Sequence, residues 1–300
     1  MPCYHPREVP KRGFADLRIT TACGQCIGCR LEKTRQWATR CVHEASLHEE
    51  NAFVTFTYSS KHLPSGGTLD KSHFPAFMKR LRKSQSHYDA FGNLWARKIR
   101  FFMSGEYGDG DRRPHYHAIL FNYYPKDAKL ARPKVGRKEA LYISKELDEL
   151  WGMGFCWVGQ VSYKSAGYTA RYIVKKVTGD PADEHYRTVD PATGEVHQLL
   201  PEFALMSRRT GIGKGWFNKF HTDLYPDDFT ISEGRKNGKP PAYYDKLLRR
   251  RDCAAHEAVK AKRTEKLLDP KLRANSTPVR LAVREEVKQA AISLRKRNLT

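Results

Sequence analysis

Two histidines one residue apart, His115 and His117, are the side chains whose type and spacing point most directly to chemistry. Side chains on a strand alternate between its two faces, so both imidazoles would point the same way. Glu106, a little earlier in the chain, could add a carboxylate and complete a three-ligand metal site with open positions. The histidine pair alone would also fit the solvent side of a half-buried strand.

Two tyrosines, Tyr168 and Tyr172, have the spacing of neighbours on one helix face. Their Cβ atoms would lie roughly 5–6 Å apart, so both phenols could address one reacting atom. Core packing is the ordinary explanation of such a pair. Arg171 and Lys175 each follow a tyrosine by one helical turn and could hold a phosphate or ease phenol ionisation, although solvated helix charges fit equally. Together with the histidines, the tyrosines favour metal-assisted cleavage of DNA.

The charge of the chain indicates a polyanionic partner. Its 300 residues hold 54 Lys+Arg against 33 Asp+Glu, a formal net charge of +21, while a hydrophobic content of 40% indicates a folded protein. Nucleic acid is the partner that such a balance favours. No apolar run approaches the length of a membrane span, and the polar N-terminus lacks the apolar stretch of a signal peptide. We therefore expect no membrane association and a cytoplasmic location.

Three of the seven cysteines form a cluster with two residues between successive members, Cys23, Cys26 and Cys29. Seven cysteines are too sparse for a disulfide scaffold, and thiolates at this spacing can share a tetrahedral Zn²⁺. An iron–sulfur cluster uses the same ligand type, and three cysteines on a turn without a metal are the other alternative. The preferred fourth zinc ligand is Cys3, and the other candidates are His5, Cys41 and His43.

Apolar periodicity predicts alternating helices and strands. The helices are expected at 30–48, at 69–83, directly after an N-cap at Ser144, and at 165–177; the strands are expected at 52–58, 98–106, 114–122 and 154–163. From the first strand onward, the order β-α-β-β-α-β followed by a helix is that of a ferredoxin-like α+β core. The short turn between the second and third strands predicts a hairpin in the sheet centre, with Glu106 and both histidines on one face.

The C-terminal part is strongly basic, and its sequence pattern indicates its structure and role less clearly. Residues 231–300 hold 19 Lys+Arg and 8 Asp+Glu, with helix-like stretches at 243–266 and 278–296. Such a density marks a phosphate-binding face or the ordinary surface of helices packed on the core. The glycine-rich segment 207–216 lacks the spacing of a phosphate-binding P-loop, so we expect no ATPase and no nucleotide cofactor.

Several longer motifs resemble a known family. They are Met-Pro-Cys-Tyr-His-Pro at 1–6, Cys-Gly-Gln-Cys-Ile-Gly-Cys-Arg at 23–30, Phe-Val-Thr-Phe-Thr at 53–57, Arg-Pro-His-Tyr-His-Ala-Ile-Leu-Phe at 113–121, and Ala-Gly-Tyr-Thr-Ala-Arg-Tyr-Ile-Val-Lys-Lys at 166–176. In these motifs the chain resembles the HUH superfamily of single-strand DNA endonucleases, specifically the rolling-circle replication initiators of gokushovirus-type microviruses. One departure is Tyr116, an aromatic residue between the histidines where an aliphatic one is usual.

The resemblance implies an enzyme that nicks and rejoins single-stranded origin DNA. Tyr168 and Tyr172 would be the two nucleophiles, forming a 5′-phosphotyrosine, and Glu106, His115 and His117 would hold Mg²⁺ or Mn²⁺. A host helicase and polymerase would be partners in the bacterial cytoplasm. Two alternatives remain: a mobilisation relaxase or transposase of the same superfamily, and a zinc-containing DNA-binding protein without activity.

We expect three parts along the chain. Residues 1–50 would form a cysteine cluster and a helix packed on the core. Residues 51–180 would form an HUH endonuclease core around a central antiparallel sheet, and residues 181–300 a basic, mainly helical extension.

Overall fold

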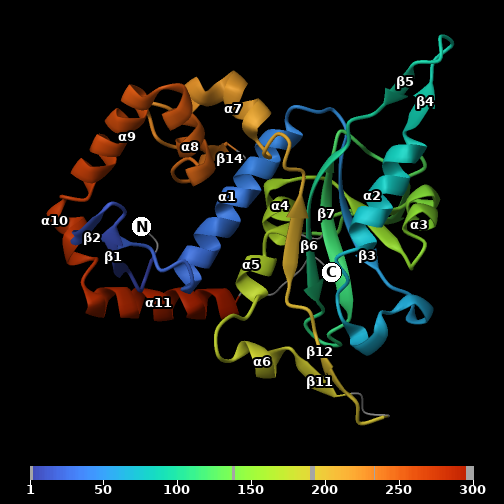
Figure 1. Ribbon diagram of the computed structural model, residues 1–300, viewed down its shortest axis with the longest axis horizontal. Coiled ribbons are helices and arrows are strands. Elements are labelled where there is room, and N and C mark those ends of the chain that lie inside the picture. Colours follow the sequence, from blue (N-terminus) through green and yellow to red (C-terminus); the bar gives the residue numbers. More distant parts are fainter. Residues whose placement is uncertain (1–2, 137–138, 190–192, 233, 295–300) are drawn as a thin grey trace. The chain divides into compact units, whose positions relative to one another are not determined.

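The computed structural model describes residues 3–136, 139–189, 193–232 and 234–294. The chain forms two compact units, one of residues 38–216 and one that combines residues 1–37 with 217–300 (Figure 1). The long helix α1 (Ile27–Ala45) begins in the second of these and ends in the first. The sequence predicts consecutive segments that divide at residues 50 and 180, whereas the two units are defined by packing and combine distant segments. The predicted division therefore stays a prediction.

A seven-stranded sheet forms the centre of the 38–216 unit. Its strands lie in the order β13-β6-β7-β3-β10-β9-β8, and every neighbouring pair is antiparallel. The strands are β3 (Asn51–Thr57), β6 (Arg100–Tyr107), β7 (Pro114–Phe121), β8 (Lys129–Arg132), β9 (Leu141–Ile143), β10 (Cys156–Gly159) and β13 (Phe203–Met206). The predicted hairpin between the second and third core strands is confirmed as β6–β7. The last core strand, β10, is shorter than expected because only four residues pair with β3.

Two helices cover one face of this sheet, α2 (His73–Ser84) and α3 (Lys145–Trp151) (Figure 1). Alternate strand residues such as Phe56 and Tyr116 face them and pack against Phe77 and Trp151, all fully buried. The predicted N-cap of α3 is confirmed, since the Ser144 hydroxyl accepts a hydrogen bond from the Leu147 N–H. This face holds the core and leaves the opposite face of the sheet for other side chains.

The helix predicted over 165–177 is wrong as one element. It is divided into α4 (Tyr163–Thr169) and α5 (Tyr172–Lys175). Between them the N–H groups of Arg171, Ile173 and Val174 bond to carbonyls three residues back, which tightens the turn. The physical reason lies in a tertiary contact, because α5 turns toward β6 and directs the Lys175 amine onto Glu106.

Residues 181–216, the first part of the extension predicted over 181–300, form short strands as well as a helix. After the short helix α6 (Ala182–His185), β11 (Arg187–Val189) and β12 (Val196–Gln198) form a hairpin, and β13 then pairs with the edge of β6. A second inserted hairpin, β4 (Ser86–Tyr88) with β5 (Leu94–Ala96), follows α2. Three short 3₁₀ helices lie at Ser60–His62, Ser65–Gly67 and His221–Asp223.

The second unit combines a hairpin with several helices. The hairpin consists of β1 (Arg7–Lys11) and β2 (Phe14–Thr21). The remaining elements are α7 (Lys214–Phe220), which begins in the first unit, β14 (Ile231–Ser232), β15 (Arg235–Lys236), α8 (Ala242–Arg251), α9 (Cys253–Lys266), α10 (Pro270–Ala274) and α11 (Pro278–Ser293). The helix predicted over 243–266 is interrupted at Asp252, because its carboxylate accepts the Ala255 N–H and starts α9 afresh.

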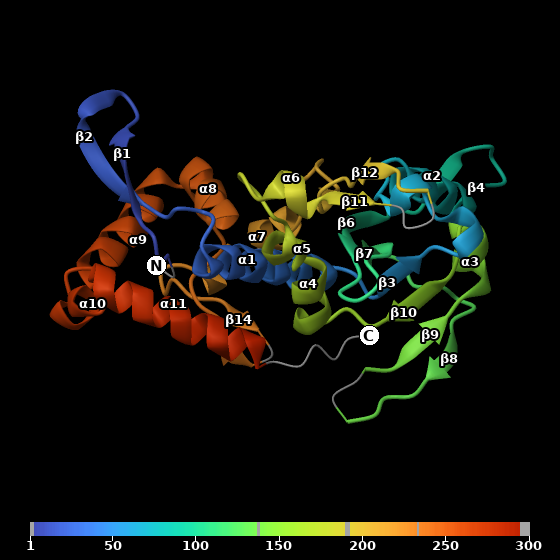
Figure 2. The ribbon, with the colours of Figure 1, turned by 90° about the horizontal axis from the view of Figure 1, so that it is seen from below.

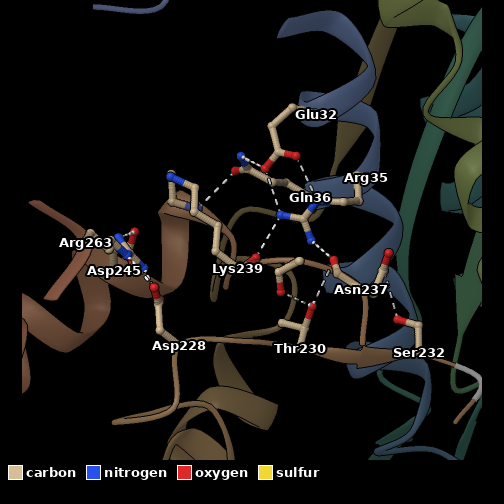
Figure 3. A network of polar contacts seen from close by, with 12 residues as sticks. Glu32, Arg35, Gln36, Asp228, Thr230, Ser232, Asn237, Lys239, Asp245 and Arg263 are labelled. Carbon is tan, nitrogen blue, oxygen red and sulfur yellow. Dashed lines mark hydrogen bonds and ion pairs between the residues drawn. The ribbon is translucent and has the colours of Figure 1, made fainter. Parts of the chain in front are cut away.

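Polar contacts tie the elements of this unit together (Figure 3). The Arg35 guanidinium pairs with Glu32 on α1 and donates to the carbonyl oxygens of Asn237 and Lys239, at 2.6 and 2.8 Å. Arg263 on α9 bonds to the carboxylates of Asp228 and Asp245 at 2.6 to 2.9 Å. Such charge-assisted contacts fix the first half of α1 against the β14–β15 segment and α8 against α9. Across the described ranges, no helix combines the length and the apolar character needed to cross a membrane.

Candidate active site between the sheet and helices α4 and α5

Glu106, His115 and His117 meet on the sheet face opposite α2 and α3. The β6–β7 register places Glu106 directly opposite His115, and Ser104 opposite His117. Residues in this relation point their side chains to the same face. The ligand atoms of the three residues lie within 4.8 Å of one another; Glu106 and His117 are buried, and His115 is partly exposed. The hairpin expected from the sequence therefore assembles this group.

Both imidazoles are held through Nδ1. His117 Nδ1 lies 3.0 Å from the Thr55 hydroxyl on the neighbouring strand β3, and His115 Nδ1 lies 3.1 Å from the Arg113 carbonyl oxygen. A carbonyl can only accept, so His115 donates from Nδ1 and keeps its Nε2 lone pair. His117 Nε2 points to Glu106 and lies 3.1 Å from its Oε1. Histidine ligands of metals are usually oriented in the same way, by a hydrogen bond to the ring nitrogen that does not face the metal.

The polar atoms at the centre of the group, which could bind a metal, lack hydrogen bonds from the described part of the chain. Both Glu106 oxygens and His117 Nε2 are buried and, among the described residues, have no partner in hydrogen-bond geometry, although their separations are short. Buried polar atoms without partners are costly. A cation at their common centre would satisfy them, and two imidazoles with one carboxylate are a known ligand set. The group is compatible with metal binding.

Lys175 supplies positive charge at the same place. Its amine lies 2.8 Å from Glu106 Oε2 and 3.2 Å from Asp109, and it donates to the Tyr107 carbonyl. Burial alone would raise the pKa of Glu106, but the contact with His117 and the charge of Lys175 outweigh it and hold that pKa below its usual range. Burial and the neighbouring His117 lower the pKa of His115 to about 4. At neutral pH the site thus has an ionised carboxylate and a neutral His115, the forms that bind metals.

Tyr168 lies beside this group. Its ring packs edge-on against the His117 ring, with centroids 4.7 Å apart and an interplanar angle of 82°. The Arg171 guanidinium carbon lies 4.9 Å from the centroid of the Tyr168 ring. The face of the sheet against which α4 and α5 pack therefore carries a phenol and a guanidinium next to the three candidate ligand side chains.

Tyr172 is placed differently. It is the first residue of α5, and burial raises its pKa to about 12. Among the described residues, Tyr168 packs on His117 and Tyr172 makes no ring contact with either histidine. The expectation that both phenols share one helix face assumed a continuous helix and does not carry across the break between α4 and α5.

The four cysteines form a second group, in the unit that contains the chain's N-terminus. The sulfur atoms of Cys3, Cys23, Cys26 and Cys29 all lie within 4.8 Å of one another, and none is in a disulfide. Gly24 has a φ of +77°, and the following N–H groups of Gln25 and Cys26 donate to Cys23 Sγ. Burial opposes ionisation of the Cys23 thiol, but these donors outweigh it and lower its pKa to about 6. This group too is compatible with metal binding.

Comparison with known proteins places these residues in a family. A family model described as replication-associated protein ORF2/G2P matches residues 51–177. The chain is 33% identical to the replication-associated protein VP4 of Bdellovibrio phage phiMH2K, over 74% of this chain and 65% of that protein. It is 32% identical to the replication-associated protein ORF2 of Spiroplasma virus 4, over 76% of this chain and 67% of that protein.

The chain belongs to the replication-associated proteins of gokushovirus-type microviruses. A further member, the replication-associated protein ORF4 of Chlamydia phage 1, is 34% identical over 51% of this chain and 38% of its own length. The chain spans about two thirds of the length of the first two relatives. No solved structure matches it.

Sequence reasoning missed three neighbours of the site in this replication-associated protein. Thr55 holds His117, the Arg113 carbonyl holds His115, and Asp109 shares Lys175 with Glu106. Thr55 had a signal, because it is a hydroxyl at an alternate position of a strand that is otherwise mostly apolar. The other two had none, since a main-chain carbonyl and a turn carboxylate acquire their roles only from the conformation of the β6–β7 turn.

Proposed function

We propose that this replication-associated protein initiates rolling-circle replication by nicking and rejoining single-stranded origin DNA through a 5′-phosphotyrosine. The observation that carries the proposal is the packing of the Tyr168 ring against His117, within the group of Glu106 and the two histidines. The order β10-β3-β7-β6 of the four core strands supports an HUH endonuclease core of ferredoxin-like topology, with α2 and α3 as its crossover helices.

The tyrosines do the covalent chemistry in this scheme. The Tyr168 phenol loses its proton and its oxygen attacks the scissile phosphorus; the bond from phosphorus to O3′ breaks, and O3′ takes up a proton as a free 3′-hydroxyl. The phosphodiester is exchanged for a phosphotyrosine, so the later rejoining needs no added energy source. Arg171, which lies over the Tyr168 ring, would hold the phosphate. Tyr172 serves as the second nucleophile for the cut that releases the circular product.

Glu106, His115 and His117 would hold the metal ion, Mg²⁺ or Mn²⁺. When bound, the ion supplies Lewis-acid polarisation of the scissile phosphate. Imidazole ligands favour Mn²⁺ over Mg²⁺. Lys175 compensates the charge of Glu106 and stays next to the reacting phosphate, where a second positive charge stabilises the transition state.

The four cysteines would hold a structural Zn²⁺. Four thiolates at metal–sulfur distances of about 2.3 Å form a tetrahedron with edges of about 3.8 Å. The Sγ atoms of Cys23 and Cys29 are 3.9 Å apart, close to that edge and far from a disulfide. Metal analysis of protein purified without chelator decides between zinc and an iron–sulfur cluster. Finding neither metal would remove this site.

The partner in this proposal is a single-stranded DNA origin, met in the cytoplasm of the host bacterium. Glycine-rich residues 207–216 lack P-loop spacing. Strand separation and synthesis would therefore come from a host helicase and polymerase, and the basic C-terminal residues would add phosphate contacts.

A covalent-adduct assay tests the proposed chemistry. The purified protein is incubated with labelled single-stranded origin DNA and Mn²⁺, denatured and separated by electrophoresis. We expect a shifted protein–DNA band with the native protein, none with His115→Ala, and none when Tyr168→Phe and Tyr172→Phe are combined. Alone, Tyr168→Phe should lose more of the first adduct than Tyr172→Phe, because only Tyr168 packs on His117.

The matched control is Tyr163→Phe, a tyrosine on the same helix α4, which should leave the adduct unchanged. An adduct that persists in the double variant would reassign the nucleophile. Native protein that binds DNA but forms no adduct with any divalent metal would favour a zinc-containing DNA-binding protein without activity.

A further inference from the structure

The β1–β2 hairpin is an element without a core of its own. Nearly every residue of its two strands is exposed, including the apolar Phe14, Leu17 and Ile19, at 60%, 48% and 41% of their surface. Figure 2 shows it extending beyond the helices of its own unit. A two-stranded hairpin is marginally stable in water by itself. Something at its base must therefore hold it.

The four-cysteine group lies at that base. Cys3 precedes the first strand and Cys23 follows the second, so the sulfur cluster closes the ends of the hairpin on each other. The main chain supports the closure, since the Cys23 N–H donates to Cys3 Sγ at 3.2 Å and the Tyr4 N–H to Cys26 Sγ at 3.3 Å. Cys26 and Cys29 connect the same cluster to the start of α1. A metal bound there would fasten the hairpin to the long helix.

The hairpin is predominantly cationic. Its two strands and turn carry Arg7, Lys11, Arg12 and Arg18 against Glu8 and Asp16. Arg12 in the turn is exposed, and the Lys11 amine lies 5.0 Å from the centroid of the Phe14 ring. Two-stranded ribbons of this kind fit the major groove of duplex DNA, which is about 12 Å wide. Guanidinium and ammonium groups at the turn would meet phosphates and base edges there.

We propose that the β1–β2 hairpin is a metal-anchored ribbon that grips duplex DNA. The cluster metal fixes the base of the ribbon and its cationic turn enters the groove. Duplex binding then depends on the four cysteines, whereas strand transfer on a single strand depends on Glu106 and the histidines. The inference rests on the metal proposed for the cysteines and on DNA as the partner, and it is independent of which tyrosine attacks.

Charge reversal at the turn is the first test. Lys11→Glu combined with Arg12→Glu is compared with native protein for binding to a short fluorescein-labelled duplex, followed by anisotropy over a range of salt concentrations. We expect duplex affinity to fall about tenfold or more and the salt slope to shrink by about two. Adduct formation on single-stranded DNA with Mn²⁺ should stay at the native level.

The matched control reverses two exposed lysines far along the chain, Lys129→Glu with Lys219→Glu, and so changes the net charge equally. This control should lower the affinity for duplex DNA less than the turn variant does. The ratio of its affinities for duplex and single-stranded DNA should equal that of the native protein. Duplex affinity in the turn variant equal to that of this control would overturn the proposal and leave the hairpin as a site for a protein partner.

Metal removal is the second test. Native protein is stripped with a zinc-selective chelator, then measured before and after Zn²⁺ is restored, beside Cys23→Ser combined with Cys26→Ser. We expect the stripped protein to lose duplex affinity at least as strongly as the turn variant and to regain it with Zn²⁺. Unchanged duplex binding after verified metal loss would contradict the proposal. Absence of any adduct, even from native protein, would instead count against the nuclease and leave this result standing.

Discussion

Thr55 is the side chain on which the orientation of His117 depends. Its hydroxyl lies 3.0 Å from Nδ1 of that ring, and the other nitrogen then points at Glu106. The Phe53 ring is stacked with the same imidazole at 5.8 Å, so rotation of His117 is restricted on its flank as well. A ligand held in this way gives up little rotamer freedom when it binds a metal.

Loss of the Thr55 hydroxyl should therefore weaken metal binding. Thr55→Val keeps the shape of the side chain, and we expect the Mn²⁺ dissociation constant to rise about tenfold, while Thr55→Ser stays near native. Calorimetric titration of the protein with Mn²⁺, without DNA, measures this directly. The control is Thr264→Val on α9, whose hydroxyl donates to the Lys260 carbonyl of the same helix. Equal affinities in the two valine variants would show that Thr55 does not position His117.

Among the elements, the second half of α1 is fastened to β6 by a buried ion pair. Glu44 on α1 is 1% exposed, pairs with Arg100 and accepts the Gly213 N–H at 2.7 Å. Arg100 in turn donates to the Thr210 carbonyl, and Arg40 donates to the Ile212 carbonyl at 3.0 Å. The main chain of the glycine-rich segment 207–216 is thus held by charged side chains of α1 and β6.

Glu44→Gln should lower the free energy of unfolding by about 3 kcal/mol, because it leaves the buried Arg100 without a counter-charge. Denaturant titration followed by circular dichroism gives the value. Glu50→Gln removes the carboxylate of a more exposed pair with Arg97 and should cost under about 1 kcal/mol. Similar losses in the two variants would mean that the Glu44 pair contributes no more than a surface contact.

The elements that the sequence predicted well are those with local signals. β3, β6 and β7 are short runs rich in apolar and aromatic residues, and one short turn fixes the register that joins Glu106 to His115. β13 was missed because it is four residues long and pairs with a strand about a hundred residues away. The break between α4 and α5 was missed because the residues after it make a tertiary contact, that of Lys175 with Glu106, which no local pattern indicates.

For the whole molecule, the two ends of the chain form one unit and its middle forms the other. Every proposed nuclease residue lies within 38–216, and the family model matches residues 51–177 inside that unit. The cysteine group and the hairpin belong to the same compact unit as residues 217–300, which include the basic C-terminal helices. The overall charge of +21 is expected to make DNA binding by either unit steeply dependent on salt.

Peptide mapping of the covalent adduct is the measurement that tests the central claim most directly. Native protein is reacted with single-stranded origin DNA and Mn²⁺, digested with protease and nuclease, and analysed by tandem mass spectrometry. We predict that the first cleavage leaves a nucleotide attached through its phosphate to Tyr168. The same modified peptide should be absent from the Glu106→Ala variant. A nucleotide on a residue other than Tyr168 or Tyr172, or an adduct that forms equally without divalent metal, would contradict the account.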